Sequence, residues 1–360
     1  MKLHGALVLA LISTGASAAQ SQVPPRPSFA EWLTGVRSEA LARGIKPDIV
    51  EEALGKIEEP LPVVIERDRA QAETVLSLEK YLTRALAPKT VRAGREIVAR
   101  HRALLDQVSA RYEVPPRIIA GVWGMESSFG RFTGTRPIVA ALATLAWDPR
   151  RSTFFRNELF DALEIVNRGD IELTQLRGSW AGAMGQVQFM PSSYLKFAED
   201  FDGDGHRDVW SDTGDIFASI ANYLKGHGWV AGQDWGREVR ITRESARRIA
   251  GGVARRSGGC RATRDMTVPL PRGRWHELGV RLPGGKPLPA STPEASLVSG
   301  ETRHFLVYHN YDAILDYNCA NSYAISVALL GNAVLSSEPA KKPAQKPASK
   351  PRTKHRARRP

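Results

Sequence analysis

A single carboxylate stands near the polar end of an apolar segment that could form a helix. The pair Pro115-Pro116 suits a helix start, and Ile119, Val122 and Glu126 follow at spacings of three and four, so Glu126 shares a face with apolar neighbours. Burial disfavours the ionised carboxylate, and an acid that keeps its proton near neutral pH can protonate the leaving oxygen of a glycosidic bond. The alternative is a solvated glutamate that caps or salt-bridges a helix end.

A second unusual segment, from Gly178 to Tyr194, is rich in small residues that let the backbone approach another group closely. Within it, the amide of Gln188 precedes the apolar pair Phe189-Met190. A buried amide is costly without hydrogen-bond partners, and the hydroxyl groups of a sugar would supply them. This segment therefore favours a catalytic role for Glu126 over a helix cap.

An acidic loop follows, and its first half matches the calcium-binding loop of an EF-hand. Asp200, Asp202 and Asp204 would supply oxygen ligands at alternate positions. Gly205 would make the sharp turn, and His206 would offer its backbone carbonyl. The twelfth position is Ser211, which leaves Asp208, Asp212 and Asp215 to supply the closing oxygens. We expect Asp215 to do so and also to cap the next helix. The alternative is an Asp/Gly turn without metal, and a bound Ca2+ would be structural.

The N-terminus predicts export. Residues 1–18 combine Lys2, an apolar stretch from Ala6 to Ile12 and a small-residue cleavage site, as in a secretory signal peptide, and residues 19–27 form a polar leader. No later segment offers about 20 uninterrupted apolar residues. The mature protein is therefore expected to be soluble and periplasmic. Cys260 and Cys319 could form a bridge there or remain two buried thiols.

The basic charge of the chain is concentrated at its C-terminus. The formal net charge is +12, and residues 338–360 contain nine Lys or Arg against one Glu. This segment alternates Lys, Pro and Ala without hydrophobic periodicity, so we predict an extended, disordered arm. It could contact an anionic wall polymer or membrane surface, or act only as a solubilising tail. Nucleic acid is not expected as the partner of an exported protein.

Apolar spacing predicts a mainly α protein. With 360 residues and 42% hydrophobic composition, the chain can bury one large core or two to three smaller ones. Helical periodicity recurs up to about residue 235 and includes one long helix from Ile97 to Tyr112. Glycines, prolines and short apolar runs then predict a small irregular α+β subdomain. The expected division is an N-terminal helical region (28–110), a core with the acidic loop (111–235), the small subdomain (236–303), a return to the core (304–335) and the basic tail (336–360).

Several long motifs occur in the order found in one family of bacterial enzymes. Over most of residues 28–335 the chain resembles the lytic murein transglycosylase B family, which has soluble and membrane-bound members. The motifs are Val114-Pro-Pro, Glu126-Ser-Ser-Phe-Gly-Arg, Leu142-Ala-Thr-Leu, the segment from Ala181 to Tyr194, the acidic loop and Ala221-Asn-Tyr. The resemblance implies a lysozyme-like helical core with a groove for glycan strands of peptidoglycan, the expected partner.

The resemblance also implies the reaction and the residues of the groove. Glu126 would act first as acid and then as base, cleaving the MurNAc–GlcNAc bond without water or cofactor to leave a 1,6-anhydroMurNAc end. The implied groove residues are Ser179, Gln188, Tyr223, Tyr317, Asn318 and Tyr323, with Tyr81 at the far wall. Two positions depart from the family pattern, because Cys319 directly follows the Tyr-Asn pair and Phe154 stands where a tyrosine is expected. Tyr223 and Tyr323 also fall on helical stripes where aromatic residues usually pack in the core.

Two other functions are compatible with the sequence. A hydrolytic muramidase would need a second carboxylate to direct water, and Glu158, Asp161 and Asp148 are the candidates. A non-catalytic, calcium-stabilised module that binds the wall would need no acid. The apolar setting of Glu126 argues against such a module.

Overall fold

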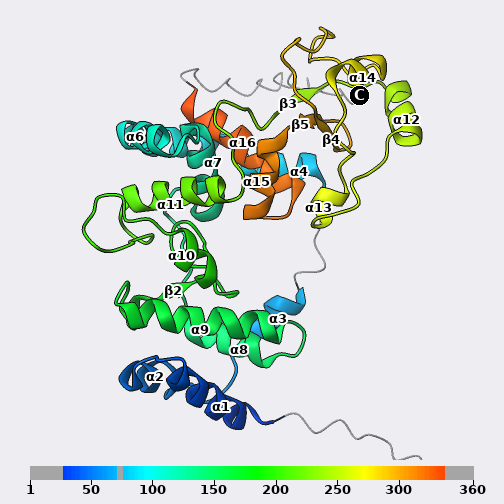
Figure 1. Ribbon diagram of the computed structural model, residues 1–360. Coiled ribbons are helices and arrows are strands. Elements are labelled where there is room, and N and C mark those ends of the chain that lie inside the picture. Colours follow the sequence, from blue (N-terminus) through cyan, green and yellow to red (C-terminus); the bar gives the residue numbers. More distant parts are fainter. Residues whose placement is uncertain (1–26, 71–75, 337–360) are drawn as a thin grey trace, which may run out of the picture.

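The computed structural model describes residues 27–70 and 76–336, and helices dominate this part of the chain (Figure 1). The predicted signal peptide, nearly all of the leader and the basic tail beyond Ser336 lie outside the described residues. Over the two described ranges, no helix combines the length and the apolar character needed to cross a membrane. The strands are few and short, as the expected mainly α class requires.

Five helices pack together at one end of the molecule, away from the small sheet (Figure 1). They are α1 (Phe29–Ala42), α2 (Pro47–Leu54), α3 (Pro62–Ala70), α8 (Ile138–Trp147) and α9 (Ser152–Arg168). α8 and α9 form an extensive contact, and each of α1 to α3 packs on one or both of them. The boundary predicted at residue 110 therefore separates helices that share one apolar core.

A second group of helices surrounds α7 (Pro116–Ser127), the helix that carries Glu126. α16 (Asn321–Leu335) packs along α7, and the remaining members are α4 (Leu78–Ala85), α5 (Pro88–Arg100), α6 (Arg102–Tyr112), α11 (Thr213–Gly226) and α15 (His309–Tyr317). α10 (Pro191–Phe197) contacts both α9 and α11, and so joins this group to the first one.

The single long helix predicted from Ile97 to Tyr112 is wrong, because the chain forms two helices that meet at His101. The backbone of His101 leaves the helical region (φ −105°, ψ 13°), ends α5 and begins α6. The imidazole ring packs edge-on against Trp123 and Phe217. Apolar residues keep their helical spacing across the break, so periodicity alone does not reveal it.

The chain beyond Gly236 forms the small α+β unit that its composition predicts. Its elements are β3 (Gly236–Val239), α12 (Arg243–Gly252), α13 (Arg261–Arg264), α14 (Arg272–Glu277), β4 (Ser296–Ser299) and β5 (His304–Val307). The strands are antiparallel in the order β3-β5-β4, and an apolar cluster of this unit is centred on the fully buried Trp275. Because β5 is the central strand, the boundary predicted between residues 303 and 304 falls inside this sheet.

Two short elements lie near the groove segments. The two-residue strands β1 (Arg136–Pro137) and β2 (Arg177–Gly178) pair in an antiparallel manner, and a 3-10 turn, Leu173–Gln175, precedes β2. The pairing places the start of the small-residue segment against the chain that follows α7. Glycine is required there, because a methyl group on Gly134 would overlap the backbone of Gly178.

Cys260 and Cys319 form a disulfide, with their Cα atoms 6.2 Å apart. The bridge spans 59 residues of sequence. It ties the residue before α13 to the segment that directly follows α15, and α15 ends at Tyr317. The cysteine that departs from the family pattern therefore links the small α+β unit to the end of α15.

α7 and α16 approach each other so closely that both require glycine at the contact. A methyl group on Gly121 would overlap the backbone carbonyl of Val327 on α16, and one on Gly331 would overlap the carbonyl of Arg117 on α7. A backbone atom cannot rotate away as a side chain can, so a larger residue would push the helices apart. This reciprocal pair sets the distance between the two helices.

Gly331→Ala should therefore lower the free energy of unfolding by about 1–3 kcal/mol. The matched control is Gly35→Ala on α1, where no atom lies within 4 Å of the added methyl group. The control should raise stability by about 0.5–1 kcal/mol, because alanine has the higher helix propensity. Urea denaturation of both variants measures the difference. A Gly331→Ala protein as stable as the wild type would contradict the close packing.

Candidate active site

Glu126 lies in the last turn of α7, directly before a tight left-handed turn. Residues 128–130 all have positive φ, between 52° and 81°. Two of the three are not glycine, so the conformation is strained and needs support. The fully buried Ser127 supplies it, since its hydroxyl donates to the carbonyl of Trp123 at 3.1 Å and accepts from the N–H of Gly130 at 3.0 Å. The turn ends the helix immediately after the carboxylate.

The carboxyl group of Glu126 is densely surrounded by protein although its side chain keeps partial solvent exposure. Burial raises its pKa to about 7, and a hydrogen bond from Tyr323 opposes the rise. The Tyr323 hydroxyl donates to Oε1 at 2.5 Å. Within the described residues no basic side chain perturbs this pKa. The geometry is therefore that of a sheltered acid, not of a salt-bridged helix end.

Four of the tyrosines singled out from the sequence lie within electrostatic reach of Glu126. Burial and then the charge of Glu126 raise the pKa values of Tyr81, Tyr317 and Tyr323. Burial, followed by the charges of Asp316 and Glu126, raises the pKa of Tyr223 to about 12. The residues come from α4, α11, α15 and α16, so the fold gathers side chains that are far apart in sequence.

The hydroxyl groups of the tyrosines are anchored to named acceptors. Tyr317 donates to the carbonyl of Val187 at 2.8 Å, and Tyr223 donates to the carbonyl of Asp316 at 2.8 Å. The rings of Tyr223 and Tyr317 lie 4.6 Å apart. Tyr223 was expected either to line the groove or to pack in the core. It does both, because this residue packs in the core and also lines a cavity.

The small-residue segment forms a rigid wall. The hydroxyl of Ser179 accepts from the N–H groups of Ala181 and Ala183, at 3.3 and 3.0 Å. The amide nitrogen of Gln188 donates to the carbonyls of Thr133 and Gly185, at 3.0 and 2.9 Å. A sugar is therefore not needed to satisfy the donors of Gln188, contrary to the expectation. No donor among the described residues bonds to its Oε1, which is the atom left for a ligand.

Two cavities are lined by residues that surround Glu126 in sequence or in space. One, of about 450 Å3, is lined by Tyr81 and by three neighbours of Glu126 on the chain, which are Gly124, Met125 and Ser128. The other, of about 260 Å3, is lined by Gln188, Tyr223, Tyr317, Phe154 and Glu158, among others. Tyr81 thus lines one cavity and Gln188, Tyr223 and Tyr317 line another, whereas Ser179, Tyr323 and Glu126 itself line neither of the two.

Two positions of the expected groove, Asn318 and Phe154, are exposed. Asn318 is exposed, ends α15, and lines neither of the two cavities. Phe154, which stands where a tyrosine is expected, lines the second cavity and is 48% exposed. The departure from the family pattern therefore lies in the groove itself.

Sequence reasoning missed two residues that support the site. The carboxylate of Glu79 on α4 accepts from the backbone N–H groups of Thr302 and Arg303, at 2.7 and 3.0 Å, and so fastens the helix of Tyr81 to the turn before β5. Gln186 accepts from the indole N–H of Trp123 at 2.7 Å and donates to the carbonyl of Trp210 at 2.8 Å. The only signal in the sequence that could have revealed Gln186 is its position two residues before Gln188.

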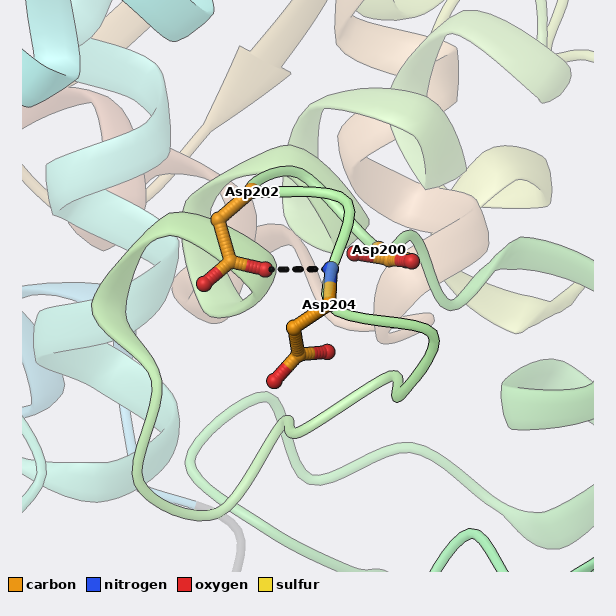
Figure 2. A group of neighbouring side chains, drawn as sticks. All are labelled: Asp200, Asp202 and Asp204. Carbon is orange, nitrogen blue, oxygen red and sulfur yellow. Dashed lines mark hydrogen bonds between the residues drawn. The ribbon is translucent and has the colours of Figure 1, made fainter.

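The acidic loop brings three predicted ligands together. Oxygens of Asp200, Asp202 and Asp204 lie within 4.8 Å of one another, and Figure 2 shows the three carboxylates and the bond from the N–H of Asp204 to Asp202, of 3.2 Å. Asp200 also accepts from the N–H groups of Gly203 and Gly205, at 2.7 and 2.9 Å. His206 is exposed, and its N–H donates to Asp204 at 2.7 Å.

Asp215 binds backbone groups of the acidic loop and does not cap the next helix as predicted. Its two oxygens accept from the backbone N–H groups of Phe201 and Asp208, both at 2.7 Å, so it joins the two ends of the loop. Burial raises its pKa to about 6 although these bonds oppose the rise. The prediction that Asp215 caps α11 is wrong, because the cap is Asp212, which accepts from the N–H of Asp215.

The raised pKa of Glu126 predicts how stability depends on pH. Between the ordinary pKa of about 4.5 and the folded value of about 7, the folded protein binds the extra proton, so stability falls as pH rises through this window. Glu126→Gln cannot ionise and still accepts from Tyr323. It should therefore be more stable than the wild type at pH 8, by about 3 kcal/mol, and the difference should vanish near pH 4.

Thermal denaturation at both pH values measures this effect. The control is Glu52→Gln, an exposed glutamate on α2. A difference between Glu126→Gln and the wild type that is the same at pH 4 and pH 8 would show that Glu126 titrates normally.

Comparison with known proteins places this geometry in a family. A family model described as "Transglycosylase SLT domain" matches residues 28–332. The membrane-bound lytic murein transglycosylase B of Escherichia coli (strain K12) is 42% identical over 154 residues, which cover 42% of this chain and 42% of that protein. The match thus spans less than half the length of this curated relative.

Solved structures agree over more of the chain. SltB3 from Pseudomonas aeruginosa, in complex with NAG-anhNAM-pentapeptide, is 39% identical with a TM-score of 0.76, over 85% of this chain and 79% of that one. The Escherichia coli lytic transglycosylase Slt35, in complex with calcium, is 29% identical with a TM-score of 0.70, over 84% of this chain and 92% of that one. The mainly α, lysozyme-like fold expected from the sequence is confirmed. The chain belongs to the transglycosylase SLT domain family.

Proposed function

We propose that the chain is a peptidoglycan lytic transglycosylase in which Glu126 is the catalytic acid and then the base. The observation that carries the proposal is the isolation of this acid. Its pKa of about 7 reflects burial and the hydrogen bond from Tyr323, and no second carboxylate among the described residues contributes. Membership of the family and the two cavities lined by Tyr81 and by Gln188, Tyr223 and Tyr317 give further support.

The reaction needs one group that first gives and then takes a proton. Protonated Glu126 donates to the glycosidic oxygen, and the MurNAc–GlcNAc bond breaks. The carboxylate then accepts the proton of the MurNAc 6-hydroxyl as that oxygen bonds to the anomeric carbon. A 1,6-anhydroMurNAc end and a free GlcNAc hydroxyl result, without net uptake of water. The Tyr323 hydroxyl stabilises the ionised carboxylate between the two transfers.

The groove residues have separate roles in this proposal. Gln188 offers Oε1 to a sugar hydroxyl from the rigid wall that Ser179 helps to hold. Tyr223 and Tyr317 present ring edges and faces in the cavity on that side, and Tyr81 does so in the other cavity. Asn318 would reach a strand only at the exposed rim.

The hydrolytic alternative needs a second carboxylate that is free to direct water. Both oxygens of Glu158 accept from Ser192, at 2.9 Å from its N–H and 2.7 Å from its hydroxyl. Asp148 accepts from the N–H and the guanidinium of Arg150, at 3.1 and 3.3 Å. Asp161 lines neither the cavity of Tyr81 nor the cavity of Gln188 and Tyr223. These contacts favour the mechanism without water.

The acidic loop suits a structural Ca2+. All the expected donors are oxygens, and three carboxylates converge on an exposed side of the loop, which matches the ligand preference of this ion. Asp200, Asp202 and Asp204 would hold it, with the backbone carbonyl of His206. Asp215 would close the loop through its two hydrogen bonds, with no direct coordination required. The ion would stiffen the loop that Gln186 joins to α7 and would take no part in the chemistry.

Export, the periplasmic location and a wall-binding or membrane-binding role for the basic tail remain predictions from the sequence. They concern residues outside the described part of the chain. The disulfide is consistent with an oxidising compartment.

Glu126→Gln should abolish the release of products from purified peptidoglycan while the protein stays folded and still binds the polymer. Mass spectrometry of the wild-type products should show anhydro ends, lighter by one water than hydrolysed ends. The matched control, Glu52→Gln, should release products at the wild-type rate. Reducing MurNAc ends in the wild-type digest would indicate a muramidase, and binding without any product would indicate a non-catalytic module.

Removal of Ca2+ should lower the melting temperature. A ligand bound only by the folded state stabilises it by about 2.7 kcal/mol at a hundredfold excess over Kd. The Asp202→Asn/Asp204→Asn protein should show no response to chelator or to added Ca2+. Identical melting curves of the wild type with Ca2+ and with chelator would refute the proposed ion site.

A further inference from the structure

Positive charge is concentrated in the small α+β unit. Residues 236–303 contain fourteen Lys or Arg and six Asp or Glu, a net charge of +8. The rest of the described chain, residues 27–70, 76–235 and 304–336, contains 25 Lys or Arg and 30 Asp or Glu, a net charge of −5. The basic character of the folded part therefore belongs to this unit alone, and an anionic partner is drawn to that side of the molecule.

α12 carries arginines on its outer face. Ser245 and Ile249 are buried on its inner face, whereas Arg243 and Arg247 are exposed and lie one turn apart, a spacing at which like charges repel each other. Neither α12 nor α14 forms an extensive contact with a helix outside the unit, and both lie far from α1 and α2 (Figure 1). The outer face of α12 is thus open to a partner.

A second pair of like charges lies next to α12 in the chain. Arg240 and Arg281 face each other in an antiparallel bridge, and each backbone N–H donates to the other carbonyl, at 2.7 and 3.1 Å. Their neighbours Val239 and Val280 are buried in the apolar cluster of the unit, so both arginines point away from this cluster. Like charges that directly face each other are unfavourable, and a bound anion would relieve the repulsion.

Arg248 connects the two pairs. Its guanidinium lies 3.5 Å from the carbonyl of Leu278, which directly follows α14, and 3.8 Å from the carboxylate of Glu244. Glu244 thus offsets one charge of five on adjoining segments. We define the basic patch as Arg240, Arg243, Arg247, Arg248 and Arg281.

The position of the basic patch favours an extended surface over a small ligand. None of its residues lines the cavity of Tyr81 or the cavity of Gln188 and Tyr223. A small molecule is held by a cavity that surrounds it, whereas cations spread over an outer face contact several anions only if the partner presents an array of them.

The chemistry of the unit favours phosphate groups of lipids as that array. Thirteen of its fourteen basic residues are arginine, whose planar guanidinium binds phosphate oxygens in a bidentate manner. Lipids also move laterally and can gather beneath fixed cations, whereas the carboxylates of a cross-linked wall polymer are held at fixed spacings.

The unit offers no apolar side chain for insertion into a bilayer. The exposed large hydrophobic residues of the described chain all lie outside residues 236–303, and they are Leu41, Phe132, Phe154 and Val230. Contact with a bilayer would therefore stay at the level of the headgroups, and its strength would come from charge.

We propose that the small α+β unit docks on an anionic phospholipid surface through the basic patch. This inference goes beyond the proposed function and does not depend on the reaction. Docking leaves the two cavities of the groove free for a glycan strand, because the basic patch lines neither of them.

The test is sedimentation of the full-length protein with vesicles of equal parts phosphatidylcholine and phosphatidylglycerol. Arg240→Gln/Arg243→Gln/Arg247→Gln removes three charges of the basic patch and should weaken binding about a hundredfold, because each basic residue near an anionic bilayer contributes about fivefold. Wild-type binding should fall as salt is added, and vesicles of phosphatidylcholine alone should bind no protein.

The matched control removes the same charge elsewhere. Lys56→Gln/Arg67→Gln/Arg92→Gln changes three exposed residues outside the unit and should bind the anionic vesicles within about twofold of the wild type, since distant charges are screened. Both triple variants keep the basic segment 338–360, so its contribution is the same in the two proteins.

Four outcomes overturn the assignment. Equal weakening by the two triple variants would show that only total charge matters. Unchanged binding of the patch variant would assign the attraction to other cations, and a wild type that ignores anionic vesicles would remove the site. The patch variant should sediment with purified peptidoglycan as the wild type does, and an equal loss there would assign the basic patch to the wall polymer.

Cleavage of peptidoglycan is measured separately on the same proteins. Both triple variants should cleave at the wild-type rate, because neither changes a residue of the groove. A wild type that fails to cleave would count against the proposed function and would leave the vesicle results valid.

Discussion

The proton affinity of Glu126 depends on how closely two helices pack. The glycine contacts at Gly121 and Gly331 bring α7 and α16 together, and this approach both shelters the carboxyl group and lets Tyr323 reach it. Burial raises the pKa and the tyrosine hydroxyl lowers it. The balance, near 7, suits a group that must release and recover one proton at neutral pH. A looser contact between the helices would let water in and move the pKa toward the value of a free glutamate.

The groove is built from segments that are remote in sequence and separately fastened. Glu79 fastens the helix of Tyr81 to the turn before β5, and Tyr317 is fastened by its bond to Val187. The bond of Gln186 to Trp123 joins the wall segment to α7, and its bond to Trp210 joins the same segment to the acidic loop. The small α+β unit and the acidic loop thus support the site by holding its backbone segments in place.

Much of this arrangement could be predicted from the sequence. Helical spacing around Glu126 identified the sheltered acid, and alternation of Asp with Gly identified the loop in which Asp200, Asp202 and Asp204 converge. The break at His101 could not be predicted, because the apolar pattern continues through it. The backbone partners of the Gln188 amide nitrogen were not foreseen and the cap of α11 was assigned wrongly, since a sequence shows which groups need partners but not which backbone atoms fold back to supply them. Whether the two cysteines pair was likewise decided by their distance in space.

The disulfide has a consequence for the integrity of the chain. Residues 261–318 lie within the covalent ring that Cys260 and Cys319 close, and this ring contains α14, β4, β5 and Tyr317. A proteolytic nick at any one peptide bond in this ring leaves the two fragments joined. Such a nicked molecule remains one covalent molecule as long as the bridge is intact. On a reducing gel it would separate into two bands.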